Sequence, residues 1–137
     1  MPPDAAVNET EPEVILDIVF EDGLLYAAVR NISTRPAYRV SVGFDKGFTG
    51  LGGAQETSSL RLFRNIEFLA PQKEIRTLVD TAASYFARKQ PKKLVAEVRW
   101  RSSDGKRHSH TITHDLSIYE QVAYVTRKET HAGLLPS

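Results

Sequence analysis

Residues 14–31 are VILDIVFEDGLLYAAVRN, and this stretch decides the fold class. Apolar and polar side chains alternate along it with a period of two residues, which is typical of a β-strand with one buried face. We therefore predict two strands, residues 14–21 and 24–31. The buried faces should carry Val14, Leu16, Ile18 and Phe20 in the first strand and Leu25, Ala27 and Val29 in the second.

Asp22-Gly23, between these strands, is a strong hairpin signal, because a type I′ turn needs positive φ at both central residues. A two-residue loop would pair position 20 with 25, 18 with 27 and 16 with 29. The apolar sets of the two strands then lie opposite each other, so the turn chemistry and the hydrophobic pattern predict the same register.

Five further strands are predicted, at residues 37–45, 60–69, 74–80, 93–101 and 107–116. Their inward faces should carry, in turn, Tyr38, Val40, Val42 and Phe44; Leu62, Ile66 and Phe68; Ile75, Thr77 and Val79; and Leu94, Ala96, Val98 and Trp100. Residues 81–90 lack alternation and are expected to form a short helix or turn between the sheets. Residues 117–128 fit either a helix or a strand.

The pattern as a whole predicts an all-β protein, an immunoglobulin-like antiparallel sandwich of about seven strands with a short helical crossover. Strands and helices do not alternate along the chain, so a parallel sheet is not expected. The domain is expected to cover residues 13–128, between a disordered arm at residues 1–12 and a tail at residues 129–137.

A family resemblance points the same way. Residues 29–40, VRNISTRPAYRV, contain an apolar residue, an asparagine, a tight turn, an alanine and an alternating strand. This resembles the second and third strands of bacterial immunoglobulin-like domains of the adhesion-related CARDB type. Trp100 followed by Asp104-Gly105, and the corner at residues 68–71, extend the resemblance to roughly residues 14–116.

The resemblance departs from the family at one turn, where Ser33-Thr34 replaces the usual glycine after the asparagine. It implies a binding or spacer module with an immunoglobulin-like fold. A fold supports many functions, so the function has to be argued from a site.

The amino-acid composition excludes several kinds of functional site. The chain has 137 residues, a net charge of +1, a pI near 8.0 and no cysteine. Disulfides, iron–sulfur clusters and thiol nucleophiles are excluded, and no strong overall electrostatic partner is expected. The first residues do not resemble a signal peptide and no apolar run could span a bilayer. We therefore expect a cytoplasmic protein, while attachment to a surface or a larger assembly stays open.

Three histidines, His108, His110 and His114, share one face of the strand predicted at residues 107–116, and alternate imidazoles can bind a metal. The register of the preceding hairpin decides their surroundings. A two-residue loop at Asp104-Gly105 would place them opposite arginines, whereas a turn with a glycine bulge would place them on the core side. Neither arrangement resembles a prepared ligand set, so no metal or other cofactor is predicted.

The segment of residues 81–110 is basic, with eight Lys or Arg against Glu97 and Asp104, so it carries a charge of +6 (8 minus 2). Its cations are Arg88, Lys89, Lys92, Lys93, Arg99, Arg101, Lys106 and Arg107. A polyanion or a carbohydrate could bind this segment, and Arg99, Arg101, Lys106 and Arg107 are its candidate binding residues.

Residues 46–59 form a long glycine-rich segment, which predicts either a binding loop or a loose edge. Phe48 and Leu51 in this loop, with Arg39 on the strand before it, are candidates for contact with a protein partner. No nucleophile elbow, phosphate loop or dinucleotide motif occurs. The sequence therefore predicts a non-catalytic protein-interaction or spacer module, with polyanion or carbohydrate binding as the alternative.

Overall fold

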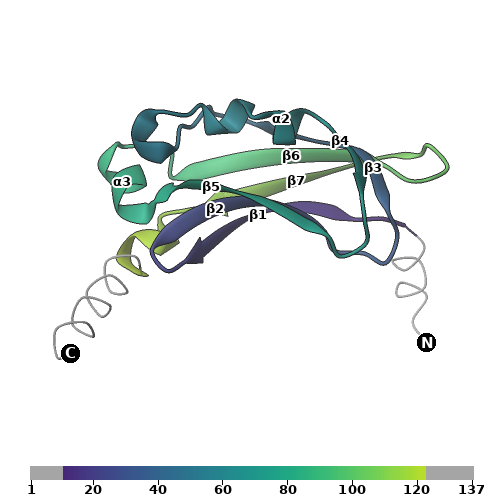
Figure 1. The fold of residues 1–137 in the computed structure, drawn as a ribbon, viewed down its shortest axis with the longest axis horizontal. Coiled ribbons are helices and arrows are strands. Elements are labelled where there is room, and N and C mark those ends of the chain that lie inside the picture. Colours follow the sequence, from purple (N-terminus) through teal and green to yellow (C-terminus); the bar gives the residue numbers. More distant parts are fainter. Residues whose placement is uncertain (1–10, 123–137) are drawn as a thin grey trace.

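The computed structural model describes residues 11–122. They form two antiparallel sheets with the strand orders β1-β2-β5 and β4-β3-β6-β7, which lie as two layers of a sandwich (Figure 1). The strands are β1 (Val14–Glu21), β2 (Leu24–Asn31), β3 (Ala37–Phe44), β4 (Ile66–Leu69), β5 (Glu74–Thr81), β6 (Lys93–Arg101) and β7 (Arg107–Asp115). The predicted all-β sandwich is confirmed.

Four short helical segments connect the strands: η1 (Leu51–Gly53), η2 (Thr57–Ser59), α2 (Arg61–Arg64) and α3 (Ala82–Ala87). The helix α3 confirms the predicted crossover. Thr81 caps its N-terminus, because the Thr81 hydroxyl oxygen accepts a hydrogen bond from the Ser84 N–H at 3.1 Å. Residues 118–122 are helical, so helix is the better of the two alternatives for this part of the chain. The predicted arm, apart from residues 11 and 12, and the predicted tail lie outside the described residues.

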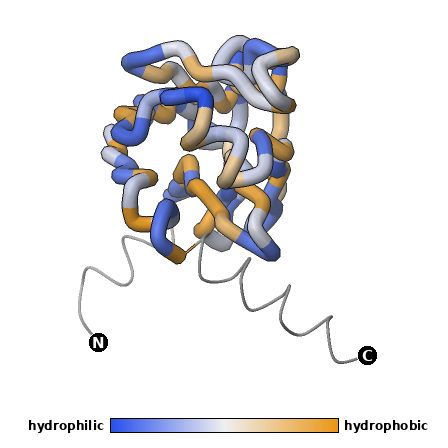
Figure 2. The backbone as a smooth tube through the Cα atoms, turned by 90° about the vertical axis from the view of Figure 1, so that its left-hand side faces the viewer, coloured by the Kyte–Doolittle hydropathy of each residue, from blue (hydrophilic) through white to orange (hydrophobic). Residues whose placement is uncertain are grey.

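One hydrophobic core lies between the sheets, and apolar and polar residues alternate along the chain that surrounds it (Figure 2). The side chains predicted to be inside β1, β2 and β6 are in this core, except Phe20, which is only partly buried against it. Its fully buried members include Leu16, Val29, Val40, Leu94 and Val98. The period-two pattern therefore identified the core faces of these strands correctly.

The β1–β2 hairpin has the predicted turn and register. Asp22 and Gly23 have φ values of 53° and 78°. Phe20 pairs with Leu25, Ile18 with Ala27 and Leu16 with Val29. Asp22 tolerates positive φ because its short polar side chain can bond locally, and glycine has no Cβ to clash.

A β-bulge at Arg39 changes the phase of β3. Arg39 has a φ of 49°, and the pairing of β3 with β6 shifts between Tyr38 and Ser41. Ala37 and Val40 are both fully buried although three positions apart, which strict alternation does not allow. Tyr38 pairs with Arg101, on the face opposite to the buried Trp100, so the prediction that Tyr38 points inward is wrong.

Residues 60–69 do not form one strand. A helical turn at residues 61–64 directs Phe63 into the core, where its ring meets the Phe44 ring edge-on at a centroid distance of 5.1 Å. Leu69 is fully buried, whereas Phe68 is 55% exposed. The prediction that Phe68 points inward is therefore wrong, and the inward aromatic of this segment is Phe63.

Side chains of β6, of β7 and of the segment after β7 bond to the outer edge of β1. The Ile32 N–H bonds to the Glu13 carbonyl, so odd positions of β1 face β2 and even positions face away. Three of these outward carbonyls have side-chain partners: Pro12 with Trp100 Nε1 at 3.1 Å, Leu16 with His114 Nε2 at 2.8 Å, and Ile18 with the Tyr119 hydroxyl at 3.2 Å. These contacts hold one side of the sandwich together.

Candidate binding face

The glycine-rich loop of residues 46–59 packs against the sandwich. Phe48 is 2% exposed and meets the Phe44 ring at 5.0 Å. A Cβ on Gly50 would collide with the Val79 carbonyl oxygen, so only glycine allows this close approach. Phe48 is therefore a core residue and not an accessible anchor, which corrects that candidate, while Leu51 is 47% exposed.

A half-buried ion pair holds the loop of residues 46–59 against β5 and α3. Arg88 Nη2 lies 2.6 Å from Asp80 Oδ2, and Arg88 Nη1 donates to the Thr49 hydroxyl at 2.6 Å. The Gly52 N–H donates to Asp80 Oδ2 at 3.0 Å. Burial alone would raise the pKa of Asp80, but the bonds from Arg88 and Gly52 outweigh it and the pKa lies below the ordinary value. Arg88 is thus a structural residue.

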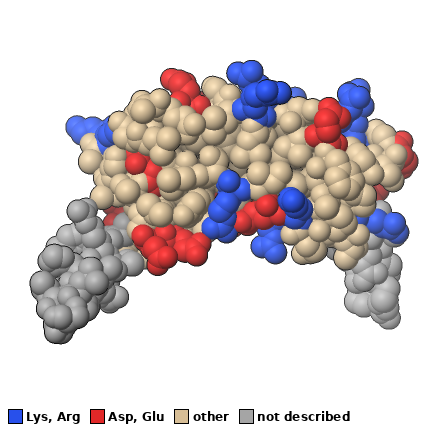
Figure 3. Space-filling view, viewed as in Figure 1, with Lys and Arg blue, Asp and Glu red and all other residues tan. Residues whose placement is uncertain are grey.

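Other members of the basic segment are also paired. Besides Arg88, the ion pairs are Lys92–Glu120 at 3.0 Å, Arg99–Glu97 at 2.7 Å and Lys106–Glu11 at 3.0 Å. On the face shown in Figure 3, Lys and Arg are interspersed with Asp and Glu. The basic segment therefore does not form a continuous positive field on that face.

The hairpin register places the three histidines on the core side of β7. His108 lies opposite Trp100, His110 opposite Val98 and His114 opposite Leu94. The connection spans residues 102–106 and has Gly105 at a φ of 86°, in agreement with the glycine-bulge alternative. Within residues 11–122 no three His, Cys, Asp or Glu side chains gather where they could hold a metal ion. His108 stacks on Trp100, and His114 holds the edge of β1.

The exposed Phe68, the half-buried Tyr38 and two arginines form one row across the outer face of the four-stranded sheet. Phe68 of β4 pairs with Tyr38 of β3, Tyr38 with Arg101 of β6, and Arg101 with Arg107 of β7. The rings of Tyr38 and Phe68 meet edge-on at 5.5 Å. Because paired residues of adjacent strands share a face, these four side chains form a single surface, here named the aromatic–arginine row.

The arginines of this row are available to a ligand. Within residues 11–122 neither Arg101 nor Arg107 has an ion-pair partner. Like charges directly opposite each other on a sheet repel, so an anion that binds between them would relieve this repulsion. Arg39, at the bulge beside Tyr38, is also exposed. Of the candidate binding residues, Arg39 and Arg107 are thus exposed and Arg101 is partly exposed, on strands that pair side by side.

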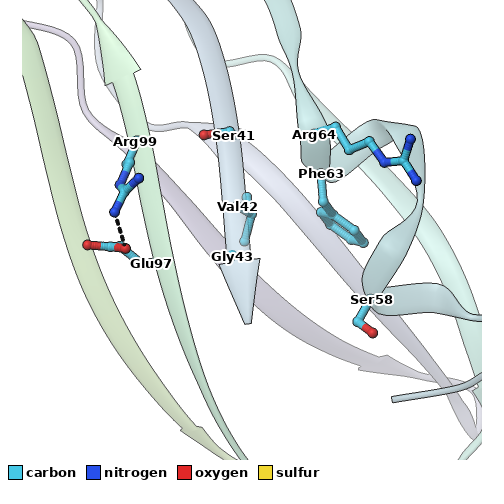
Figure 4. A pocket seen from close by; sticks show the side chains of 8 residues that line it. All are labelled: Ser41, Val42, Gly43, Ser58, Phe63, Arg64, Glu97 and Arg99. Atoms are coloured by element: carbon cyan, nitrogen blue, oxygen red, sulfur yellow. Dashed lines mark hydrogen bonds and ion pairs between the residues drawn. The ribbon is translucent and has the colours of Figure 1, made fainter. Parts of the chain in front are cut away.

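A shallow groove of about 340 Å³ lies along β3 and β6 next to this row (Figure 4). Ser41 and Gly43 form its floor, with Ser58 and Arg64 on one side and the Glu97–Arg99 pair on the other. Lys106, at the tip of the β6–β7 connection, is held by Glu11. Arg99 and Lys106 are therefore paired cations, unlike the two arginines of the row.

The period-two pattern of the sequence did not identify the two aromatic residues of the row, because it assigned Tyr38 and Phe68 to the core. Tyr38, Val40 and Val42 alternate without interruption, so the sequence gives no signal of the bulge at Arg39 that turns Tyr38 outward.

Comparison with known proteins gives one match. A family model described as Domain of unknown function (DUF8453) matches residues 4–120, which is most of the chain. No curated protein and no solved structure matches the chain. Within residues 11–122 no helix is long and apolar enough to cross a membrane.

Proposed function

We propose that this chain, which belongs to the DUF8453 family, is a non-catalytic protein-interaction module with an immunoglobulin-like fold that binds its partner on the aromatic–arginine row. The strand order supports the fold assignment. In immunoglobulin constant-type domains the third, sixth and seventh strands form one sheet, as β3, β6 and β7 do in this protein. The fourth strand here pairs with β3 instead of joining the first sheet.

The composition of the row supports a protein partner. Tyrosine, phenylalanine and arginine are enriched at the centres of protein interfaces, where a few residues supply most of the binding free energy. Phe68, at 55% exposed, is an apolar ring held in solvent at one end of the row, and Tyr38 lies between it and the two arginines. A partner segment that carries a carboxylate next to an apolar side chain complements this row. The cytoplasmic location stays a prediction.

The double substitution Tyr38→Ala/Phe68→Ala is expected to weaken partner binding at least tenfold, because each aromatic hot-spot residue contributes about 2 kcal/mol. Leu78→Ala is the matched control, since Leu78 is an exposed apolar residue on the three-stranded sheet. The measurement is quantitative affinity capture from cells that make the protein, with wild type and both variants as baits. If the double variant captures the partner as strongly as wild type does, the row is not the binding site. If wild type captures no partner, the result favours a spacer role.

Polyanion binding is the second candidate, and the absence of ion-pair partners for Arg101 and Arg107 within residues 11–122 favours it. If it holds, heparin should bind with an affinity that falls as salt rises, because phosphate or sulfate contacts release counterions. Arg101→Ala should then weaken binding at least threefold at low salt. Fluorescence polarisation at two salt concentrations measures this. Binding that is absent at low salt, or that does not change with salt, excludes this candidate.

A further inference from the structure

Among the residues that the structure describes, the backbone groups along the outer edge of β7 have no partner. The Leu116 N–H donates to the Lys92 carbonyl, and the Lys106 carbonyl accepts from Ser102, so even positions of this strand face β6. Backbone groups alternate in direction along an antiparallel strand. The N–H and C=O groups at odd positions, from Arg107 to Asp115, therefore point away from the sheet. Within residues 11–122 no hydrogen bond joins these groups to another segment.

The side chains of this edge do not protect it. Natural edge strands are commonly blocked by proline, inward-pointing charges or short length. The nine residues of β7 contain no proline and no lysine, and no bulge interrupts their pairing with β6. The odd positions between its two ends are Ser109, Thr111 and Thr113, which are exposed and of high β propensity or small size. The edge is thus a regular template for another strand.

We infer that β7 pairs antiparallel with β7 of a second copy of this chain, so that two four-stranded sheets join into one sheet of eight strands. In the full-overlap register Thr111 lies opposite its own copy, Ser109 opposite Thr113, and Arg107 opposite Asp115. All these positions are odd, so each partner presents unpaired backbone groups to the other. Threonine and serine pairs across antiparallel strands are favourable.

Charge complementarity selects the second copy as the partner. In one copy Arg107 lies opposite Arg101, a like-charge pair, while Asp115 lies opposite Lys93. Across the proposed junction each Arg107 meets the Asp115 of the other copy, which places a carboxylate beside the repelling arginines. The two-fold axis through Thr111 makes this contact twice. Registers displaced by two residues in either direction lose both of these pairs.

The dimer is expected to be weak, with a dissociation constant of about 1–100 μM, because one pair of strands buries less surface than a standard interface. This inference does not depend on the partner-binding proposal, although Arg107 belongs to both surfaces. Self-association is measured on the purified protein alone. Its absence would leave the test with Tyr38 and Phe68 unaffected.

Sedimentation equilibrium up to about 500 μM tests the inference. The monomer has a mass of 15.3 kDa, so the dimer should have twice that mass. Arg107→Asp and Asp115→Arg should each weaken the dimer at least tenfold, because each places like charges opposite each other. The double variant Arg107→Asp/Asp115→Arg restores opposite charges and should recover most of the affinity. A monomeric wild type would overturn the inference and leave the edge to an extended segment of another protein.

A proline at the junction gives a second, independent readout. Thr111→Pro removes an N–H that points to the open edge and leaves every bond between β6 and β7 intact, so it should abolish the dimer while the far-ultraviolet circular dichroism stays that of wild type. Ser103→Pro, in the connection before β7, is the matched control and should leave the dimer unchanged. If the dimer persists in Thr111→Pro and in both single charge variants, another interface forms it and the inference is wrong.

Discussion

Trp100→Ala is expected to lower the free energy of unfolding by about 3–5 kcal/mol. Trp100 is 5% exposed and lies in the core between the two sheets. Its ring stacks on His108 at 5.7 Å, and its Nε1 donates to the Pro12 carbonyl at 3.1 Å. Alanine would leave a cavity and remove the donor from a buried carbonyl. Since domains of this size are stable by about 5–15 kcal/mol, the loss is a large share of the total.

Urea unfolding followed by far-ultraviolet circular dichroism measures this loss, because the chain has one tryptophan and its fluorescence disappears with the substitution. Trp100→Phe is the matched control. It keeps most of the ring volume and loses the hydrogen bond, so we expect a cost of about 1–2 kcal/mol. A loss of less than about 1 kcal/mol in Trp100→Ala would contradict the described packing of this residue.

Asp80→Asn is expected to cost about 3–5 kcal/mol, because it leaves the half-buried Arg88 guanidinium without its counter-charge. Asp80 is 6% exposed and fastens two segments through Arg88 and the Gly52 N–H. Asparagine has almost the same shape, so the loss would come from charge and hydrogen bonding and not from volume. Thermal and urea unfolding of the variant measure it.

The double variant Asp80→Asn/Arg88→Met separates the ion pair from the fold. Replacement of both charges removes the unpaired cation, so stability should recover by at least half of the loss. The pH dependence gives another readout. The pKa of Asp80 in the folded state lies below its ordinary value of 3.8, so its stabilising contribution is present above that value and is lost as the pH falls through the folded-state pKa. Asp80→Asn should therefore lose less stability on acidification than wild type.

The parts of the fold that follow local rules could be predicted. In the β1–β2 hairpin, Asp22-Gly23 and the apolar pattern require the same register, and the structure has it. The same holds for β6, whose inward residues were all identified. Local signals suffice here because the turn and the buried face constrain the pairing independently.

The candidate binding face could be predicted only in part. Arg101 and Arg107 were identified from charge, but Tyr38 and Phe68 were not. Their outward direction depends on the bulge at Arg39 and the helical turn before β4, which form because Phe63 and Val40 fill the core. Packing of this kind joins residues far apart in the chain, and a pattern read along one strand does not contain it.

The register of β7, the strand that carries the three histidines, could likewise not be predicted from the sequence. The sequence allowed two registers after Asp104-Gly105, and each satisfies the alternation of β7. The bond from the Ser102 N–H to the Lys106 carbonyl closes a five-residue connection instead of a two-residue loop. This connection places the His108 ring against the Trp100 ring, and the burial of both rings favours this register.

The side-chain closure of β1 has a consequence for folding during synthesis. The three contacts join residues 88, 98 and 101 positions apart in the chain. The β1–β2 hairpin emerges from the ribosome first, but its outer edge stays open until Tyr119 has also emerged. Such long-range contacts slow folding, and an open strand edge can pair with another nascent chain in the meantime. A chaperone that shields this hairpin would have its greatest effect before Tyr119 has emerged.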